Sequence, residues 1–240
     1  MHPAAGLLIA YLAGSLPAAY LAGRLRGVDL RKHGSGNLGA TNVVRVLGMK
    51  AGITVFAVDV AKGALPVALL PQWVAAPRRD LWAIAFGLAA IFGHVRPVFL
   101  LGRRGGKGVA TASGVFFALA PIPMVIALTA FTLVFYASRY VSLASLTGAV
   151  VLPVALAVTR GPQSPVFVIS TLVAAFVFWT HRANIGRLRR GEEHRFGTRA
   201  AAPDVAVATA TDSGEAGPVD RRIRRRLDDR ERRQQPREGR

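Results

Sequence analysis

Residues 108–138, GVATASGVFFALAPIPMVIALTAFTLVFYAS, form a run of 31 residues without a charge and with two prolines near its centre. A membrane helix needs about 20 mainly apolar residues, so this run is too long for one ordinary span. Proline removes a backbone hydrogen bond and clashes with the preceding helical turn. We therefore predict that the run splits near Pro121 and Pro123 into two short helices; a single merged helix is the alternative.

Other long uncharged stretches surround this one. The chain is 52% hydrophobic and only 18% charged, whereas soluble domains carry about a quarter charged residues. Of the 13 acidic residues, only Asp29, Asp59 and Asp80 precede residue 192. The remaining stretches without charge, counting His as neutral, are 3–23, 63–77, 81–95, 140–159 and 161–180. This pattern predicts an all-α, polytopic integral membrane protein.

The stretch 3–23 begins close to Met1 with no basic segment before it, and it contains Gly14-Ser15-Leu16-Pro17. A cleaved signal peptide is the alternative, but with further spans behind it we expect a first transmembrane helix. The chain has no cysteine, which excludes disulfides, thiolate metal sites and a cysteine nucleophile.

The basic residues, which give a net charge of +18, gather at the ends of the apolar stretches. This placement argues against nucleic-acid binding and favours topology signals, because cytoplasmic loops are rich in Lys and Arg. Three such loops are expected inside, at 24–50, 96–107 and 182–195. Two cytoplasmic loops must be separated by an even number of membrane crossings. With the run 108–138 split in two, this condition predicts seven transmembrane helices, with the N-terminus outside and the C-terminus in the cytoplasm; five helices are the alternative.

Asp59 and Lys62 lie within the second apolar region, one helical turn apart. An ion pair at that spacing would limit the cost of burying both charges, so we expect a structural pair that faces the bundle. From residue 199 to residue 240 the sequence becomes polar and rich in arginine. We expect a transmembrane domain over 1–198 and a disordered cytoplasmic tail over 199–240.

Three polar segments at the predicted cytoplasmic side carry candidate chemistry. The first, Gly34–Arg45, combines glycines, which let the backbone approach a ligand, with short polar side chains and an arginine that suits phosphate oxygens. The second contains Gly105-Gly106-Lys107-Gly108 directly before an apolar helix, and helix N-terminal amides bind anions. It is not a Walker P-loop, because Leu101 and Gly108 occupy positions that the P-loop gives to Gly and Ser or Thr.

The third segment starts at His181. His181 and Asn184 are three residues apart, so on a continuing helix they would share a face. Glu192 and Glu193 follow, and they could orient the basic side chains or form a solvated pair.

Together these segments resemble the signature motifs of the bacterial acyl-phosphate:glycerol-3-phosphate acyltransferase family. The similarity covers roughly residues 5–195. The matching residues are Ser35-Gly36-Asn37-x-Gly39-Ala40-x-Asn42-x-x-Arg45, Gly93-His94-x-x-Pro97-x-Phe99-Leu100 with Gly105-Gly106-Lys107-Gly108-Val109-Ala110-Thr111, and His181-x-x-Asn184-Ile185-x-Arg187-Leu188-x-x-Gly191-x-Glu193.

The resemblance implies a seven-helix enzyme of the bacterial cytoplasmic (inner) membrane with its active site on the cytoplasmic face. It implies transfer of an acyl group from acyl phosphate to the 1-position of glycerol-3-phosphate, which gives lysophosphatidic acid and inorganic phosphate, the first step of phospholipid synthesis. Membrane lipid would contact the acyl chain. No cofactor and no metal is implied, and a monomer is compatible with the sequence.

The residues implied in catalysis are Ser35, His181 and Asn184. Those implied in substrate or phosphate binding are Gly36, Asn37, Thr41, Asn42, Arg45, Gly105, Gly106, Lys107, Gly108 and Thr111. Either His181 or a phosphate of the substrate could accept the hydroxyl proton.

Three other functions fit the sequence less well. No His is followed five residues later by Asp, which argues against acyltransferases that use acyl-CoA or acyl carrier protein. A CDP-alcohol phosphotransferase would need clustered aspartates. An organophosphate or phosphate transporter is the non-enzyme alternative; it would require polar groups at mid-membrane depth, where the sequence offers only Asp59 and Lys62.

Overall fold

The computed structural model describes residues 1–197, and these residues form helices without a strand. The elements are α1 (Pro3–Ser15), α2 (Ala18–Arg24), α3 (Ala40–Leu47), α4 (Met49–Leu69), η1 (Leu70–Trp73), α5 (Arg79–Val95), η2 (Val98–Leu100), α6 (Val109–Leu119), α7 (Pro121–Ser138), α8 (Val141–Arg160), α9 (Pro165–Thr180) and α10 (Arg182–Arg189). The prediction of an all-α chain is confirmed for this part. The predicted tail, 199–240, lies outside the described residues.

Within residues 1–197, five helical segments are long and apolar enough to cross a membrane. They are Pro3–Arg24, Met49–Trp73, Arg79–Leu100, Pro121–Ser138 and Val141–Arg160, and the bent pair α9 and α10 gives a sixth candidate. Helix α6 is apolar but has only 11 residues, which span about 16 Å at 1.5 Å each. The structure therefore supports a polytopic membrane protein, while the count of seven crossings stays a prediction.

The predicted split of residues 108–138 is confirmed. Helix α6 ends at Leu119, Ala120 has φ −152° and ψ 76°, and α7 begins at Pro121. Proline suits the first position of a helix, because its missing N–H would have no intrahelical partner there. Pro121 therefore both prevents α6 from continuing and provides the first residue of α7.

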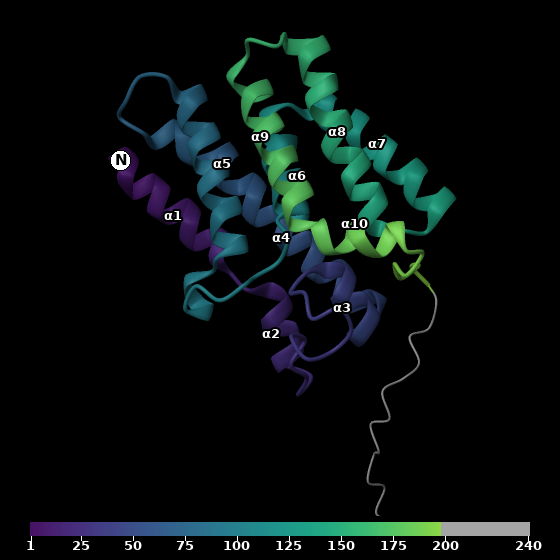
Figure 1. The fold of residues 1–240 in the computed structure, drawn as a ribbon. Coiled ribbons are helices and arrows are strands. Elements are labelled where there is room, and N and C mark those ends of the chain that lie inside the picture. The colour runs from purple at the N-terminus through teal and green to yellow at the C-terminus, as the bar shows by residue number, and fades with distance from the viewer. Residues whose placement is uncertain (198–240) are drawn as a thin grey trace, which may run out of the picture. The chain divides into compact units, whose positions relative to one another are not determined.

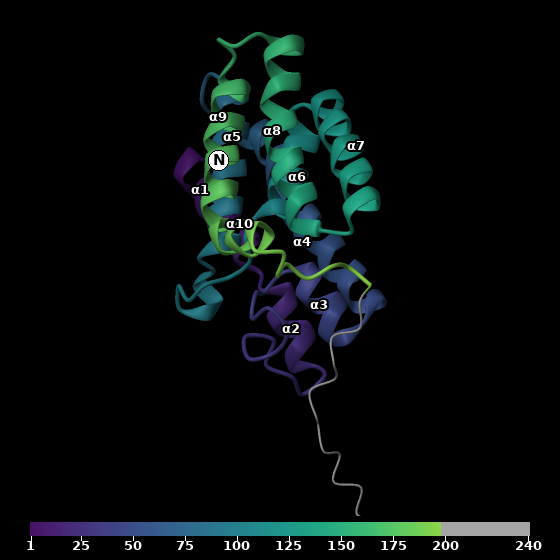
Figure 2. The same ribbon diagram turned by 45° about the vertical axis from the view of Figure 1, so that its right-hand side comes forward.

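The elements that carry the polar motifs gather at one end of the helix bundle. Figures 1 and 2 show α2, α3 and α10 at this end, with α10 running across the ends of α8 and α9. The N-terminus lies towards the other end, where the Met1 amino group donates to the Trp73 carbonyl at 2.6 Å. The bundle thus has one polar end and one end made of short connections.

Helix α4 is the central helix of this arrangement, and it packs closely on α6. A Cβ atom added to Gly63 would lie 2.1 Å from the Thr111 carbonyl oxygen, and one added to Gly114 would lie 2.0 Å from that of Val60. Close to this contact, the Nζ of Lys62 lies 2.6 Å from Oδ1 of Asp59. Both side chains are buried, so the predicted ion pair inside the bundle is confirmed.

Candidate active site

One cavity of about 560 Å³ brings the three polar segments together. The predicted site residues that line it are Ser35, Gly36, Asn37, Thr41, Arg45, Gly105, Gly106, Lys107, Gly108, His181 and Asn184. They come from parts of the sequence more than 140 positions apart, so the fold, and no local turn, creates the cavity. Asn42 and Thr111 do not line it.

The first segment is a loop followed by helix α3. Asn42 is 1% exposed, and its Oδ1 accepts a hydrogen bond from the Ser35 amide at 2.8 Å. Its Nδ2 donates to the carbonyls of Leu30 at 3.2 Å and His33 at 3.1 Å. Asn42 therefore supports the loop from its buried side, and its predicted role in substrate binding stays a prediction. The side chains of Thr41 and Arg45, one turn apart on α3, reach the cavity instead.

The second segment is a tight glycine turn that leads into α6. Gly108 has φ +86° and precedes the first helical residue, Val109, so α6 begins at the cavity wall. No side chain caps the start of α6, which leaves its first amides available to an anion. Thr111, on the first turn of α6, is fully buried where α6 contacts α4. Its predicted role in phosphate binding stays a prediction.

The third segment bends where a continuing helix was expected. Helix α9 ends at Thr180, and α10 leaves at an angle of 59°. His181 lies at the bend, 3% exposed, with Nδ1 2.8 Å from the Val177 carbonyl. Because a carbonyl can only accept, Nδ1 carries the proton in this hydrogen bond, and Nε2 of the neutral ring is the acceptor. Nε2 is therefore the ring nitrogen that could accept a proton, although burial lowers the pKa of His181 to about 4.

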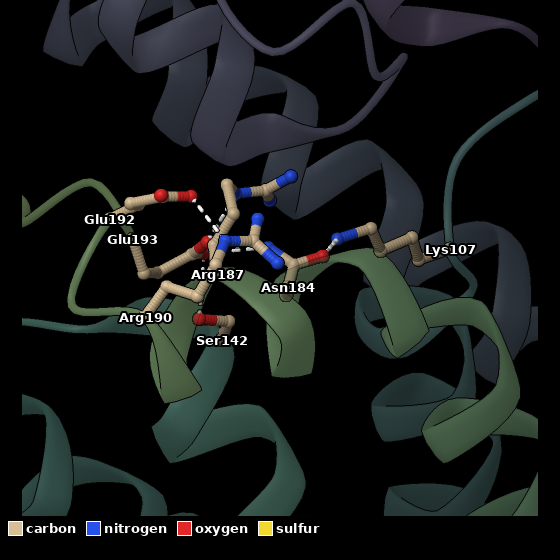
Figure 3. A network of polar contacts seen from close by, with 7 residues as sticks. All are labelled: Lys107, Ser142, Asn184, Arg187, Arg190, Glu192 and Glu193. Atoms are coloured by element: carbon tan, nitrogen blue, oxygen red, sulfur yellow. Dashed lines mark hydrogen bonds and ion pairs between the residues drawn. The ribbon is translucent and has the colours of Figure 1, made fainter.

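A polar network on one side of the cavity is centred on Glu193 (Figure 3). Its Oε1 accepts from Nδ2 of Asn184 at 2.6 Å and from Oγ of Ser142 at 2.8 Å. Its Oε2 accepts from Nε of Arg187 at 2.6 Å. The Oδ1 of Asn184 accepts a short hydrogen bond from Nζ of Lys107. Glu193 thus fixes the amide that meets the lysine.

The two neighbouring glutamates have different surroundings. Glu192 makes an exposed ion pair with Arg190 at 2.7 Å. Of the two roles expected for the glutamates, Glu192 therefore fits the solvated one better. Glu193 has a side chain only 8% exposed and connects α10 to the start of α8. The sequence placed Glu193 in the third motif, but nothing in it indicated Ser142 as a partner.

The cationic groups of the cavity are poorly neutralised. Burial lowers the pKa of Lys107 to about 8, and the charge of Glu193 only partly opposes this effect. Burial also lowers the pKa of Arg45, whose Nη1 is buried and has no hydrogen-bond partner within residues 1–197. Burial alone would raise the pKa of Glu193, but hydrogen bonds from Asn184, Ser142 and Arg187 lower it. Glu193 is therefore an anion whose oxygens are already occupied.

Away from these charges the cavity is apolar. Its walls there come from α6, α7, α8 and α9, and they include Phe116, Met124, Phe131, Gly148, Leu152 and Val173. A ligand that filled the cavity would therefore have an anionic head and a hydrocarbon part. Within residues 1–197 no three His, Asp or Glu side chains gather in a way that could hold a metal ion.

Comparisons with known proteins agree with this chemistry. The family model described as glycerol-3-phosphate acyltransferase matches residues 4–191. A glycerol-3-phosphate acyltransferase of Trichlorobacter lovleyi is 48% identical over 188 residues, which cover 78% of this chain and 94% of that protein.

Solved structures agree as well. Two structures of PlsY, an integral membrane glycerol 3-phosphate acyltransferase, are 40% identical and cover 82% of this chain and 96% of theirs. The glycerol 3-phosphate form has a TM-score of 0.75 and the lysophosphatidic acid form has a TM-score of 0.71.

Proposed function

This chain belongs to the glycerol-3-phosphate acyltransferase family, and we propose that its acyl donor is an acyl phosphate. It is a membrane enzyme that acylates glycerol-3-phosphate in phospholipid synthesis. The comparisons give no support to the transporter alternative. The observation that carries the proposed donor is a cavity with poorly neutralised cations at one end and apolar walls at the other.

In the proposed reaction the C1 hydroxyl of glycerol-3-phosphate attacks the carbonyl carbon of the acyl phosphate. The new ester C–O bond forms, the bond between that carbon and the phosphate oxygen breaks, and inorganic phosphate leaves. Both substrates and the leaving group carry phosphate, so fixed positive charge stabilises each stage. Lysophosphatidic acid is the product.

Arg45 and Lys107 are proposed to hold the phosphates, together with the amides of Gly105–Gly108 at the start of α6. The guanidinium of Arg45 has a buried nitrogen free for an anion, and its forked geometry suits phosphate oxygens. Ser35 and Asn184 line the same cavity and are proposed to position glycerol-3-phosphate. Thr41, Asn37 and Gly36 form the wall beside Arg45.

The hydroxyl proton goes either to Nε2 of His181 or to a phosphate oxygen of a substrate. The hydrogen bond from His181 to the Val177 carbonyl supports the first route, because it leaves Nε2 unprotonated. His181→Ala separates the two routes. A general base contributes about 10²–10⁴-fold, so residual turnover within about a hundredfold of wild type would exclude His181 as the sole base.

The acyl chain is proposed to lie along the apolar walls of α6–α9, with its end in contact with lipid. We also propose seven crossings, with the N-terminus outside and the site on the cytoplasmic face of the inner membrane. The basic loops near α2, α3 and α10 lie at the same end as the site, which supports this orientation.

The function is tested by following phosphate release from acyl phosphate in detergent or lipid mesophase, with and without glycerol-3-phosphate. We expect phosphate release that requires glycerol-3-phosphate and is accompanied by formation of lysophosphatidic acid. Acyl-CoA in place of acyl phosphate should give no lysophosphatidic acid. Turnover with acyl-CoA and none with acyl phosphate would overturn the proposed donor.

A further inference from the structure

Three buried ionisable side chains lie in the bundle beside the Gly105–Gly108 turn, outside the network of Figure 3. They are Asp59 and Lys62 on α4 and His94 on α5, with exposures of 2%, 6% and 6%. Burying an ion pair is expensive, and an apolar group of similar volume is often at least as stable. Stability alone therefore gives a weak reason for this cluster.

On one side the cluster is attached to the break in the first span. Nζ of Lys62 lies 2.6 Å from Oδ1 of Asp59 and donates to the Leu16 carbonyl at 2.8 Å. Leu16 and Pro17 interrupt the helix between α1 and α2, and the Leu16 carbonyl accepts from the Ala18 amide at 3.0 Å as well as from Lys62. Lys62 thus fixes α4 to the break.

On the other side the cluster meets the glycine turn through His94. Nδ1 of His94 lies 3.5 Å from Oδ1 of Asp59. A Cβ atom added to Gly106 would lie 2.2 Å from Nε2 of His94, and one added to Gly105 would lie 2.0 Å from the His94 carbonyl oxygen. The amide of Gly105 donates to the Val95 carbonyl at 3.0 Å. The turn therefore rests directly on the imidazole and on the end of α5.

The position of the imidazole consequently sets the position of the turn. Lys107 follows Gly106 immediately, and Gly108 directly precedes α6, so a shift of the imidazole would move both the amine and the helix amides. A displacement of about 1 Å can cost a large factor in a preorganised site. On the other side of the ring, Asp59, which is paired with Lys62, has its Oδ1 3.5 Å from Nδ1 of His94.

We propose that Lys62, Asp59 and His94 are positioning residues that set the Gly105–Lys107 turn for the substrate phosphate. This inference rests on the proposed phosphate site. It assigns the three residues an effect on phosphate affinity in addition to any effect on folding. Asp59 and His94 also line the cavity itself, but the role proposed for them is to set the turn, without transferring a proton.

The first test measures the Kd of glycerol-3-phosphate by calorimetry on purified protein, with thermal unfolding in parallel. We expect His94→Gln to weaken binding about five- to tenfold, the size of one ordinary hydrogen bond, because the turn is shifted while its phosphate contacts are weakened and not removed. The KM for glycerol-3-phosphate should rise by a similar factor. Ser15→Ala is the control: Ser15 is equally buried, its Oγ accepts from the Val98 amide at 3.4 Å, and affinity should not change.

Lys107→Met in the same assay separates this inference from the proposed function. If Lys107→Met weakens binding and His94→Gln does not, the positioning role is wrong and the phosphate site stands. If Lys107→Met leaves the Kd unchanged, the phosphate site and the inference that rests on it are both wrong.

A second variant guards against misfolding. Asp59→Asn with Lys62→Met removes both charges together, so no unpaired charge stays buried and the protein should fold. We expect weaker glycerol-3-phosphate binding with a thermal midpoint close to wild type. Unchanged Kd in this folded double variant would overturn the proposal, because the cluster would then be only a structural ion pair.

Discussion

Lys62 and Lys107 are both shielded from water, but their surroundings differ. Nζ of Lys62 lies 2.6 Å from the carboxylate of Asp59 and donates to the Leu16 carbonyl, so its charge is neutralised inside the bundle. Within residues 1–197, the hydrogen bond of Lys107 goes to the neutral amide oxygen of Asn184. The nearby carboxylate, Glu193, is already occupied by Arg187, Asn184 and Ser142.

This difference separates a charge that holds the fold from a charge kept for a ligand. A buried pair with its partner in place contributes structure, and removing one member leaves an uncompensated charge. A shielded cation without an anionic partner in direct contact is unfavourable until an anion arrives. The lowered pKa of Lys107, about 8, reflects that cost. Mutation of Lys62 should therefore lower mainly stability, and mutation of Lys107 should lower mainly activity.

Lys107→Met should have the largest effect on activity. We expect kcat/KM for glycerol-3-phosphate to fall by about 10³-fold, because removing one preorganised group that stabilises developing charge costs about 10²–10³-fold. The thermal midpoint should stay the same or rise, since an unfavourable charge is lost. Steady-state kinetics with thermal unfolding measures both, and a large loss of stability with nearly normal kinetics would contradict the comparison.

Lys62→Met should affect stability first. The change leaves Asp59 as a buried charge without its lysine, which costs about 3–5 kcal/mol. Thermal unfolding in detergent should show a clear fall in midpoint. The double change with Asp59→Asn should restore most of that fall, and its failure to do so would indicate that the pair does more for folding than neutralise charge.

The pH profile of the wild-type enzyme should reflect the lowered pKa of Lys107. A lowered pKa means that the amine is charged at low pH and loses its charge as pH rises through about 8. The kcat/KM, which reports the free enzyme, should therefore fall between about pH 7 and pH 9. Lys107→Arg keeps its charge, so its lower activity should not fall over that interval. The same fall in both proteins would exclude Lys107 as its cause.

Glu193→Gln should produce the smallest change in this series, a shift of that profile. The charge of Glu193 raises the pKa of Lys107, so its removal should lower that pKa and move the fall in kcat/KM to lower pH. Glutamine can still accept hydrogen bonds at its amide oxygen, which limits loss of the network. An unchanged profile would show that Glu193 acts only through hydrogen bonds.

Much of the fold follows from the sequence because the apolar runs and prolines are local signals. Pro121 marked the break between α6 and α7, and the spacing of Asp59 and Lys62 indicated their ion pair. Helix α3 was not expected, because its residues were interpreted as part of a loop. The bend at His181 was also missed, since no proline or glycine marks it.

Short motifs in the sequence predict the site residues. Which of them line the cavity, and which hold the loops in place, is shown only by the fold. Asn42 has the same polar chemistry as Asn37, and only its hydrogen bonds show that it supports the loop from behind. Ser142 lies 51 positions from Glu193, and no local pattern links them. Long-range contacts of this kind depend on helix packing.

The most direct test measures the charge of Lys107 itself. Lysine occurs only at positions 32, 50, 62 and 107, so protein labelled with ¹³C at lysine Cε gives four side-chain signals by NMR. The signal that is absent in Lys107→Arg should titrate near pH 8 in the free enzyme and at higher pH with glycerol-3-phosphate bound. A titration that glycerol-3-phosphate leaves unchanged would contradict the assignment of Lys107 to the substrate phosphate.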